Sequence, residues 1–185
     1  MEYIIGIDGG GTRCRVLISD LEGNKIDYFL GGPTSISAYG IDVVNENISA
    51  VINKFLDKYN AKIEDCKGFC IGSAGIDRDL EKEKMKNLIK DLGIKKNIIV
   101  VNDAELCLAT ETKGGPGVVL ISGTGSISYG KNEKGQTKRT GGWGHIIGDE
   151  GSGYWISKEA IRRSVYSLER NNERTVLLDI LMKEL

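Results

Sequence analysis

The sequence lacks an excess of charge of either sign, a long apolar run and a basic N-terminus. Its 25 lysine and arginine residues offset 26 aspartate and glutamate residues, for a net charge of −1. This balance gives no reason to expect a nucleic-acid or membrane-surface partner. No segment approaches the roughly 18 apolar residues of a membrane span, and Met1-Glu2-Tyr3 lacks the basic region of a signal peptide. We therefore expect a cytoplasmic protein.

Histidine and closely paired cysteines are also scarce. The four cysteines stand at positions 14, 66, 70 and 107, none of them in a Cys-x-x-Cys pair, and His145 is the only histidine. Zinc sites and iron–sulfur clusters need ligands at tighter spacing. We therefore predict buried, reduced thiols with a structural role.

Proline is rare, whereas glycine is abundant. The 185 residues include 2 prolines and 25 glycines. The length predicts one domain or somewhat more, and an apolar share of 40% is enough for a packed core. Glycine makes up only about 7% of an average chain. The glycines are clustered, which indicates loops where the backbone approaches a ligand closely. The clusters lie at 9–11, 114–117, 123–125 and 141–153.

The order of apolar patterns predicts an α/β fold. Short apolar runs bounded by turn residues predict strands, and apolar positions at helical spacing predict helices. An order of β-β-β-α-β-α-β-α predicts a mixed five-stranded sheet with helices on both sides. The expected strands span 3–8, 14–20, 25–30, 66–71 and 98–101, and the expected helices span 41–59, 79–92 and 104–112.

After a glycine-rich link the opening pattern returns. Strands are expected at 118–121 and 126–130, a hairpin turn at 132–135, and helices at 157–169 and from 174 to the end. The chain therefore starts the same fold twice. We predict one domain over 1–113 and an incomplete second copy over 114–185.

The loop Asp8-Gly9-Gly10-Gly11-Thr12 joins the first two predicted strands. Glycines let backbone N–H groups close around phosphate oxygens, and the Thr12 hydroxyl can add a donor. Asp8, at the end of a strand, is placed to hold hydrated Mg²⁺. A tight hairpin without a ligand explains the same residues, so both interpretations stay open.

A second loop of this kind, Ser122-Gly123-Thr124-Gly125-Ser126, opens the second half. Two glycine hairpins in repeated units could clamp a triphosphate between them, and the pair is more specific than either loop alone. The sequence has no Gly-Lys-Ser/Thr, which excludes a Walker P-loop. No Gly-x-Gly-x-x-Gly loop joins a strand to a helix, which argues against a dinucleotide fold.

Two further segments carry candidate polar side chains. Asp103 follows an apolar strand, at the end where α/β sheets place ligands, so it can accept a proton from a hydroxyl or simply cap the next helix. In the glycine-rich segment Gly141–Gly153, Asp149 can accept two sugar hydroxyls. Trp143 forms a pocket wall or part of the core, and His145 is a base or a structural residue.

These segments together resemble a known family. The stretches 6–12, 101–104, 121–126 and 141–153 are similar, in order and spacing, to the N-acetylglucosamine kinase branch of the BadF/BadG/BcrA/BcrD ATPase family. That family belongs to the sugar kinase, actin and heat-shock chaperone superfamily. The resemblance implies ribonuclease H-like (actin-like ATPase) domains that close over ATP, Mg²⁺ and an amino sugar.

The resemblance also assigns roles to single residues. Asp8 matches the metal-associated acid, which holds Mg²⁺ through water, and Asp103 matches the catalytic base. The expected ATP and phosphate contacts are Gly9, Gly10, Gly11, Thr12, Thr124, Gly125 and Ser126. The expected sugar contacts are Ser35, Ser73, Asp103, Gly142, Trp143, Gly144 and Asp149.

The chain departs from the family pattern in two ways. Ser35, in Pro33-Thr34-Ser35-Ile36, stands where the family has an asparagine that binds the sugar, which leaves the exact sugar open. Family members are also longer, and their adenine-binding glycine motif lies in the C-terminal half. The chain is therefore expected to be an N-terminal portion that is inactive by itself.

An ATP-dependent amino-sugar kinase is the leading hypothesis for function. An ATPase that activates an acyl-CoA reductase or dehydratase is the first alternative, although such relatives hold an iron–sulfur cluster through cysteines that do not pair here. A non-catalytic, sugar-binding regulator is the second. The expected partner is a small-molecule amino sugar, and a homodimer stays open.

Overall fold

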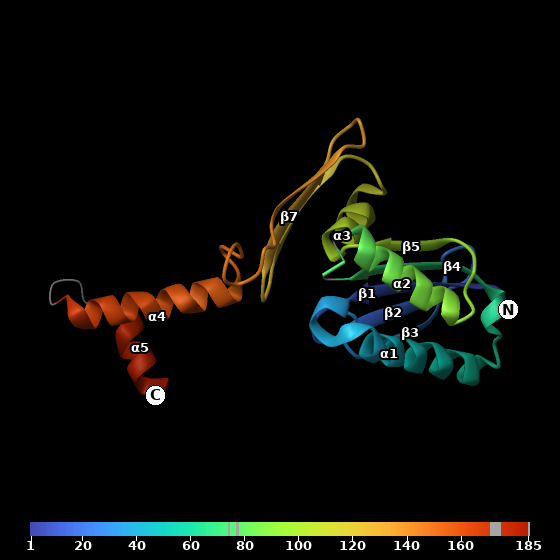
Figure 1. Ribbon diagram of the computed structural model, residues 1–185, viewed down its shortest axis with the longest axis horizontal. Helices are drawn as coiled ribbons and strands as arrows, with labels where there is room; N and C mark the ends of the chain where they lie inside the picture. Colours follow the sequence, from blue (N-terminus) through green and yellow to red (C-terminus); the bar gives the residue numbers. More distant parts are fainter. Residues whose placement is uncertain (74, 77, 171–174, 185) are drawn as a thin grey trace. The chain divides into compact units, whose positions relative to one another are not determined.

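Five strands form the sheet of the first part of the chain (Figure 1), and burial alternates along the first two of them. β1 (Tyr3–Gly9), β2 (Cys14–Ser19) and β3 (Lys25–Gly31) pair antiparallel. β4 (Cys66–Ser73) pairs in parallel with β1, and β5 (Ile98–Val101) pairs in parallel with β4. The spatial order is β3-β2-β1-β4-β5. The mixed five-stranded sheet predicted from the sequence is confirmed.

This computed structural model describes residues 1–73, 75–76, 78–170 and 175–184. The chain divides into two units, Met1–Thr110 and Glu111–Leu185, with the boundary close to the glycine-rich link. The five-stranded sheet belongs to the first unit. Within the described residues no helix is long and apolar enough to cross a membrane.

Helices cover both faces of the first sheet, as predicted. α1 (Ile36–Tyr59) and α2 (Asp79–Asp91) bury their apolar side chains in one core together with alternate residues of the strands. α3 (Asp103–Thr112) lies on the other face. Ile71 and Gly72 are consecutive in β4 and therefore face opposite sides of the sheet. Ile71 belongs to the core, whereas a Cβ on Gly72 would stand 2.5 Å from Leu106 Cβ in α3. Figure 1 shows α1 and α3 on opposite sides of the strands.

The long helix α1 contains a break at Gly40. This residue has φ +80° and ψ 164°, which separates a first turn from the helix that follows. The apolar repeat that begins at Ile41 therefore predicts the part of α1 after the break. The additional turn before Gly40 has no apolar repeat and was not predicted. The helix ends at Asn60, which adopts a left-handed conformation. A 3₁₀ turn (Ile63–Asp65) then leads into β4.

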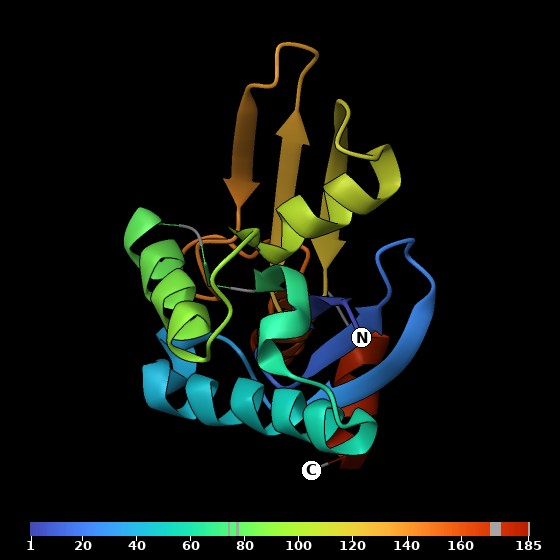
Figure 2. The same ribbon diagram turned by 90° about the vertical axis from the view of Figure 1, so that its right-hand side faces the viewer.

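Three antiparallel strands and two helices make up the second unit (Figure 2). Their bounds are β6 (Gly117–Ser122), β7 (Ser126–Lys131), β8 (Thr137–Gly141), α4 (Gly153–Glu169) and α5 (Val176–Glu184).

Sequence reasoning named the turn before β8 but not the strand itself, since Thr-Lys-Arg-Thr-Gly has no apolar residue. The helix expected from 157 begins at Gly153, because the Ser152 side chain accepts a hydrogen bond from Trp155 N and caps it. The start expected at Arg174 for the last helix lies outside the described residues.

Candidate functional site

The first glycine loop is the turn of the β1–β2 hairpin. Asp8 pairs with Arg15 and Gly9 with Cys14, and Gly10 N donates to Arg13 O over 3.0 Å. Gly11 and Thr12 therefore form a two-residue turn, and both are exposed. The loop thus presents its exposed backbone and the Thr12 hydroxyl at the end of two strands, which is the arrangement that a phosphate-binding loop requires.

Position 9 has no space for a Cβ, so only glycine fits there. A Cβ at this position would overlap Thr34 Oγ1 and stand 3.0 Å from both Ser73 Cβ and Ser73 Oγ. Thr34 and Ser73 are fully buried, and their hydroxyl oxygens lie 2.8 Å apart. Gly9, Thr34 and Ser73 therefore form a closed internal contact, named here the hydroxyl joint, which fixes the loop to the segment before α1 and to the end of β4.

Replacing Gly9 with alanine is expected to lower the free energy of unfolding by about 1–3 kcal/mol, the usual cost of overpacking a filled core site. Denaturant titration measures the loss. Gly11→Ala is the matched control, because a Cβ there meets nothing within 4 Å. An exposed change of this kind stays within about 0.5 kcal/mol of the parent. Equal stability of the two variants would contradict the role given to the hydroxyl joint.

Two carboxylates share one pocket beside this loop. Asp8 is half exposed at the end of β1, and Asp103 begins α3 directly after β5. The pocket has a volume of about 210 Å³ and belongs entirely to the first unit. The residues that line it are Asp8, Gly9, Gly10, Thr12, Arg13, Arg15 and Asp103. The structure therefore brings the predicted metal-associated acid, the predicted base and the predicted phosphate loop together.

Asn102, rather than Asp103, caps helix α3. Its Oδ1 accepts a hydrogen bond of 2.6 Å from Glu105 N, and its carbonyl accepts one from Leu106 N. Asp103 is the first helical residue, and its Oδ1 accepts from Ala104 N over 3.0 Å. Sequence reasoning left capping and catalysis open for Asp103. Asn102 therefore performs the capping, and Asp103 lines the pocket.

The pocket suits a metal ion that is held mainly by phosphate and water. Mg²⁺ prefers oxygen ligands and usually keeps several waters, with one or two carboxylates from the protein. Asp8 supplies one such carboxylate, and Asp103 lines the same pocket. Among the described residues, no three His, Cys, Asp or Glu side chains gather to hold a metal by themselves. The residues present therefore fit Mg²⁺ bound together with a nucleotide.

Cys14 and Cys66 are buried as predicted, whereas Cys70 is half-buried and Cys107 is exposed, so the prediction of a buried thiol is wrong for Cys107. Burial raises the pKa of Cys14, and the negative charge of nearby Asp8 raises it further. Burial also raises the pKa values of Cys66 and Cys70. Since only the thiolate is a good metal ligand or nucleophile, these cysteines suit packing rather than cluster binding.

The predicted sugar contacts of the first unit lie near the hydroxyl joint. Ser73 donates to Thr34 O over 3.1 Å and is fully buried, so its hydroxyl supports the site from inside. The Ser35 hydroxyl does not cap α1 but lies 3.2 Å from the hydroxyl of exposed Ser37. The Ser-x-Ser spacing at the start of α1 places these two hydroxyls side by side.

In the second unit, the glycine hairpin contacts the segment 141–153. Ser122 Oγ donates to Gly151 O over 2.9 Å, and Ser126 Oγ donates to Glu150 O over 2.7 Å. A Cβ on Gly125 would stand 2.9 Å from Asp149 Oδ2. The predicted phosphate residues Thr124, Gly125 and Ser126 therefore lie next to the predicted sugar residue Asp149.

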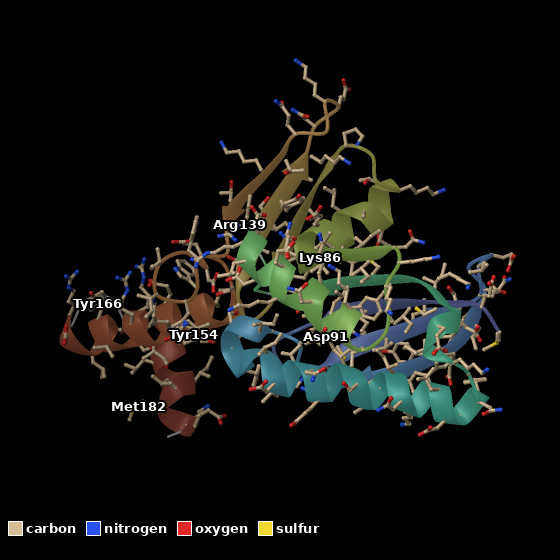
Figure 3. All side chains as sticks on the ribbon, turned by 45° about the vertical axis from the view of Figure 1, so that its right-hand side comes forward. Lys86, Asp91, Arg139, Tyr154, Tyr166 and Met182 are labelled. Carbon is tan, nitrogen blue, oxygen red and sulfur yellow. The ribbon has the colours of Figure 1, made fainter. Side chains whose placement is uncertain are left out.

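Trp143 and His145 each pack against a residue that lies outside the segment 141–153. Trp143 is 64% exposed, and the guanidinium of Arg139 lies 4.5 Å from its ring centroid. His145 packs against Tyr154, with ring centroids 4.8 Å apart. Figure 3 labels Arg139 on β8 and Tyr154 on α4, the two elements that flank the loop. Trp143 thus lies on the surface rather than in the core, and His145 has a packing partner. Gly142 and Gly144, on either side of Trp143, both have positive φ.

Comparison with known proteins identifies the class of protein that carries this site. The model of the BadF/BadG/BcrA/BcrD ATPase family matches residues 5–176, and the chain belongs to this family. A crystal structure assigned as an N-acetylglucosamine kinase from Chromobacterium violaceum superposes with a TM-score of 0.77 at 23% identity, over 99% of this chain and 64% of that one. An inorganic polyphosphate/ATP-glucomannokinase from Arthrobacter gives 0.55 at 22% identity, over 86% and 72%. The ribonuclease H-like, actin-like fold is thereby confirmed.

Two curated relatives are sugar kinases by name. The N-acetylmuramic acid/N-acetylglucosamine kinase of Clostridium acetobutylicum is 43% identical over 177 residues, which covers 96% of this chain and 58% of the relative. The N-acetyl-D-glucosamine kinase of Dictyostelium discoideum is 34% identical, over 100% and 60%. The chain therefore spans about three fifths of the length of these relatives.

Proposed function

We propose that the complete protein is an ATP-dependent kinase that phosphorylates a hydroxyl group of N-acetylglucosamine. The observation that supports this most directly is the pocket in which Asp8, Asp103 and the glycine loop meet. A kinase needs a carboxylate to accept a proton and a cradle for phosphate, and both are found there. The names of the relatives at 43% and 34% identity point to the same activity.

In the proposed reaction, Asp103 accepts the proton of the attacking sugar hydroxyl. The hydroxyl oxygen forms a bond to the γ-phosphorus of ATP in line with the bond that breaks, and ADP leaves. The turn at Gly11 and Thr12 donates hydrogen bonds to phosphate oxygens, which stabilises the developing charge. The hairpin at Thr124 and Gly125 is the second predicted phosphate contact. Mg²⁺, held through water by Asp8, would supply further positive charge to the phosphates.

In the second unit, the sugar is assigned to Asp149 and Trp143. A carboxylate accepts two hydroxyl hydrogen bonds, and an exposed indole packs against the apolar face of a sugar ring. Ser35 and Ser37 offer short side chains at the other predicted sugar contact. N-acetylmuramic acid is a second candidate acceptor, because the relative at 43% identity is named for both sugars.

A coupled assay for ADP release tests the proposal. The complete protein is supplied with ATP and Mg²⁺ and with N-acetylglucosamine, N-acetylmuramic acid or glucose in turn. We expect turnover with N-acetylglucosamine, and at most weak turnover with glucose, which lacks the acetamido group. ADP release that is independent of any sugar would indicate the ATPase activator instead. Sugar binding without ADP release would indicate the regulator.

A further inference from the structure

An ion pair lies beside the first phosphate loop. Arg15 Nη1 lies 3.0 Å from Asp8 Oδ2, and the two residues are direct partners across the antiparallel β1–β2 pair. Both side chains are about half exposed, at 54% for Arg15 and 50% for Asp8. Both also line the pocket that contains Asp103. Neither the motif nor the resemblance assigned a role to Arg15.

Arg13 and Arg15 both line this pocket beside the two carboxylates, and Arg15 is the one paired with Asp8. A polyphosphate that approaches this loop meets the negative charges of Asp8 and Asp103, which repel it unless they are neutralised. Arginine is well suited to that task, because its planar guanidinium can form two parallel hydrogen bonds to either a carboxylate or a phosphate. An ion pair that is exposed to water is weak, so it can exchange partners easily.

We propose that Arg15 is a positioning residue that exchanges partners when the metal–nucleotide complex binds. In the free protein Arg15 neutralises Asp8. When Mg²⁺ and its water compensate the charge of the Asp8 carboxylate, the guanidinium of Arg15 is released and binds a phosphate oxygen of the nucleotide. This inference rests on the proposed function, since it assumes that the loop binds a nucleotide.

A purely structural role for the pair has a different signature. A cross-strand ion pair that only stabilises the hairpin affects nucleotide binding equally with and without metal. In the exchange, metal binding and the contact of Arg15 with the nucleotide are coupled, because Arg15 is released from Asp8 only when the metal occupies that carboxylate. Without metal, a move of Arg15 toward the phosphates would leave Asp8 uncompensated beside them, so the side chain gains little by moving.

Calorimetric titration of the complete protein with the ATP analogue AMPPNP, in Mg²⁺ and in EDTA, separates these roles. Arg15→Met is expected to weaken binding about 10-fold or more in Mg²⁺, which corresponds to one lost hydrogen bond between charged groups. In EDTA the loss is expected to stay within about twofold. Lys67→Met is the matched control, since it removes a lysine from another exposed ion pair, 3.0 Å from Glu2, away from the pocket.

The outcomes are distinguishable. An equal loss in Mg²⁺ and EDTA, or no loss in either, would overturn the exchange while the proposed function survives. A parent protein that binds AMPPNP in neither condition would contradict the proposed function, and this role of Arg15 with it. Arg15→Lys, which keeps the charge but not the planar fork, is expected to recover part of the metal-dependent affinity.

Discussion

Replacing Asp103 with asparagine is expected to lower the turnover of the complete kinase by about 10²–10⁴, the usual contribution of a general base. Asparagine has nearly the same shape, and its Oδ1 can still accept the hydrogen bond from Ala104 N. Asn102 caps the helix independently. The variant should therefore fold and bind both substrates normally while the proton of the attacking hydroxyl has no acceptor.

Steady-state kinetics and calorimetric binding, measured on the same preparation, check this result. We expect kcat to fall while the dissociation constants for nucleotide and sugar change little. Glu105→Gln, which neutralises the neighbouring acid on α3, is the control and should keep most of the turnover. An Asp103→Asn enzyme with more than about a tenth of the parental turnover would mean that Asp103 is not the base.

Replacing Asp149 with alanine is expected to weaken sugar binding about 10- to 100-fold and nucleotide binding far less. Each hydrogen bond to a charged group contributes about 1.5–3 kcal/mol, so the loss of even one carries this effect. The KM values for sugar and ATP, determined separately, check the result. The contrast is informative because Asp149 lies against Gly125, the predicted phosphate contact.

Two further variants separate chemistry from shape at this position. Asp149→Asn keeps the packing against Gly125 but removes the charge, so it should lie between alanine and the parent in sugar affinity. Glu150→Ala removes the exposed neighbouring carboxylate and leaves the backbone carbonyl that accepts from Ser126. It should behave like the parent. Equal losses for both substrates in Asp149→Ala would indicate collapse of the loop instead of a lost sugar contact.

The elements that could be predicted from the sequence are those whose signal is local. Apolar runs and alternation predict the strands of the first sheet, and the repeat after Gly40 predicts the main part of α1. β8 escaped because a polar strand carries no such signal. The partnership of Asp8 and Arg15 was within reach, since a two-residue turn at Gly11 and Thr12 determines the register.

Other parts of the site depend on contacts that no local pattern encodes. The competition between Asn102 and Asp103 for the helix cap is decided by which side chain reaches Glu105 N. The burial of Ser73 depends on Thr34, which is 39 residues away in the sequence. The predicted contact of Ser73 with sugar stays a prediction. The structure also shows the exposed hydroxyl of Ser37 beside that of Ser35.

The hydroxyl joint makes the first glycine loop a property of the whole unit. Gly9, Thr34 and Ser73 come from three segments, so the position of the turn depends on the segment before α1 and on β4 as well as on its own hairpin. A peptide that contains only the β1–β2 hairpin would therefore lack the contacts that hold the loop in place. A chain that carries the Asp-Gly-Gly-Gly-Thr motif should place this loop in the same way only where small hydroxyl residues also occupy the positions of Thr34 and Ser73.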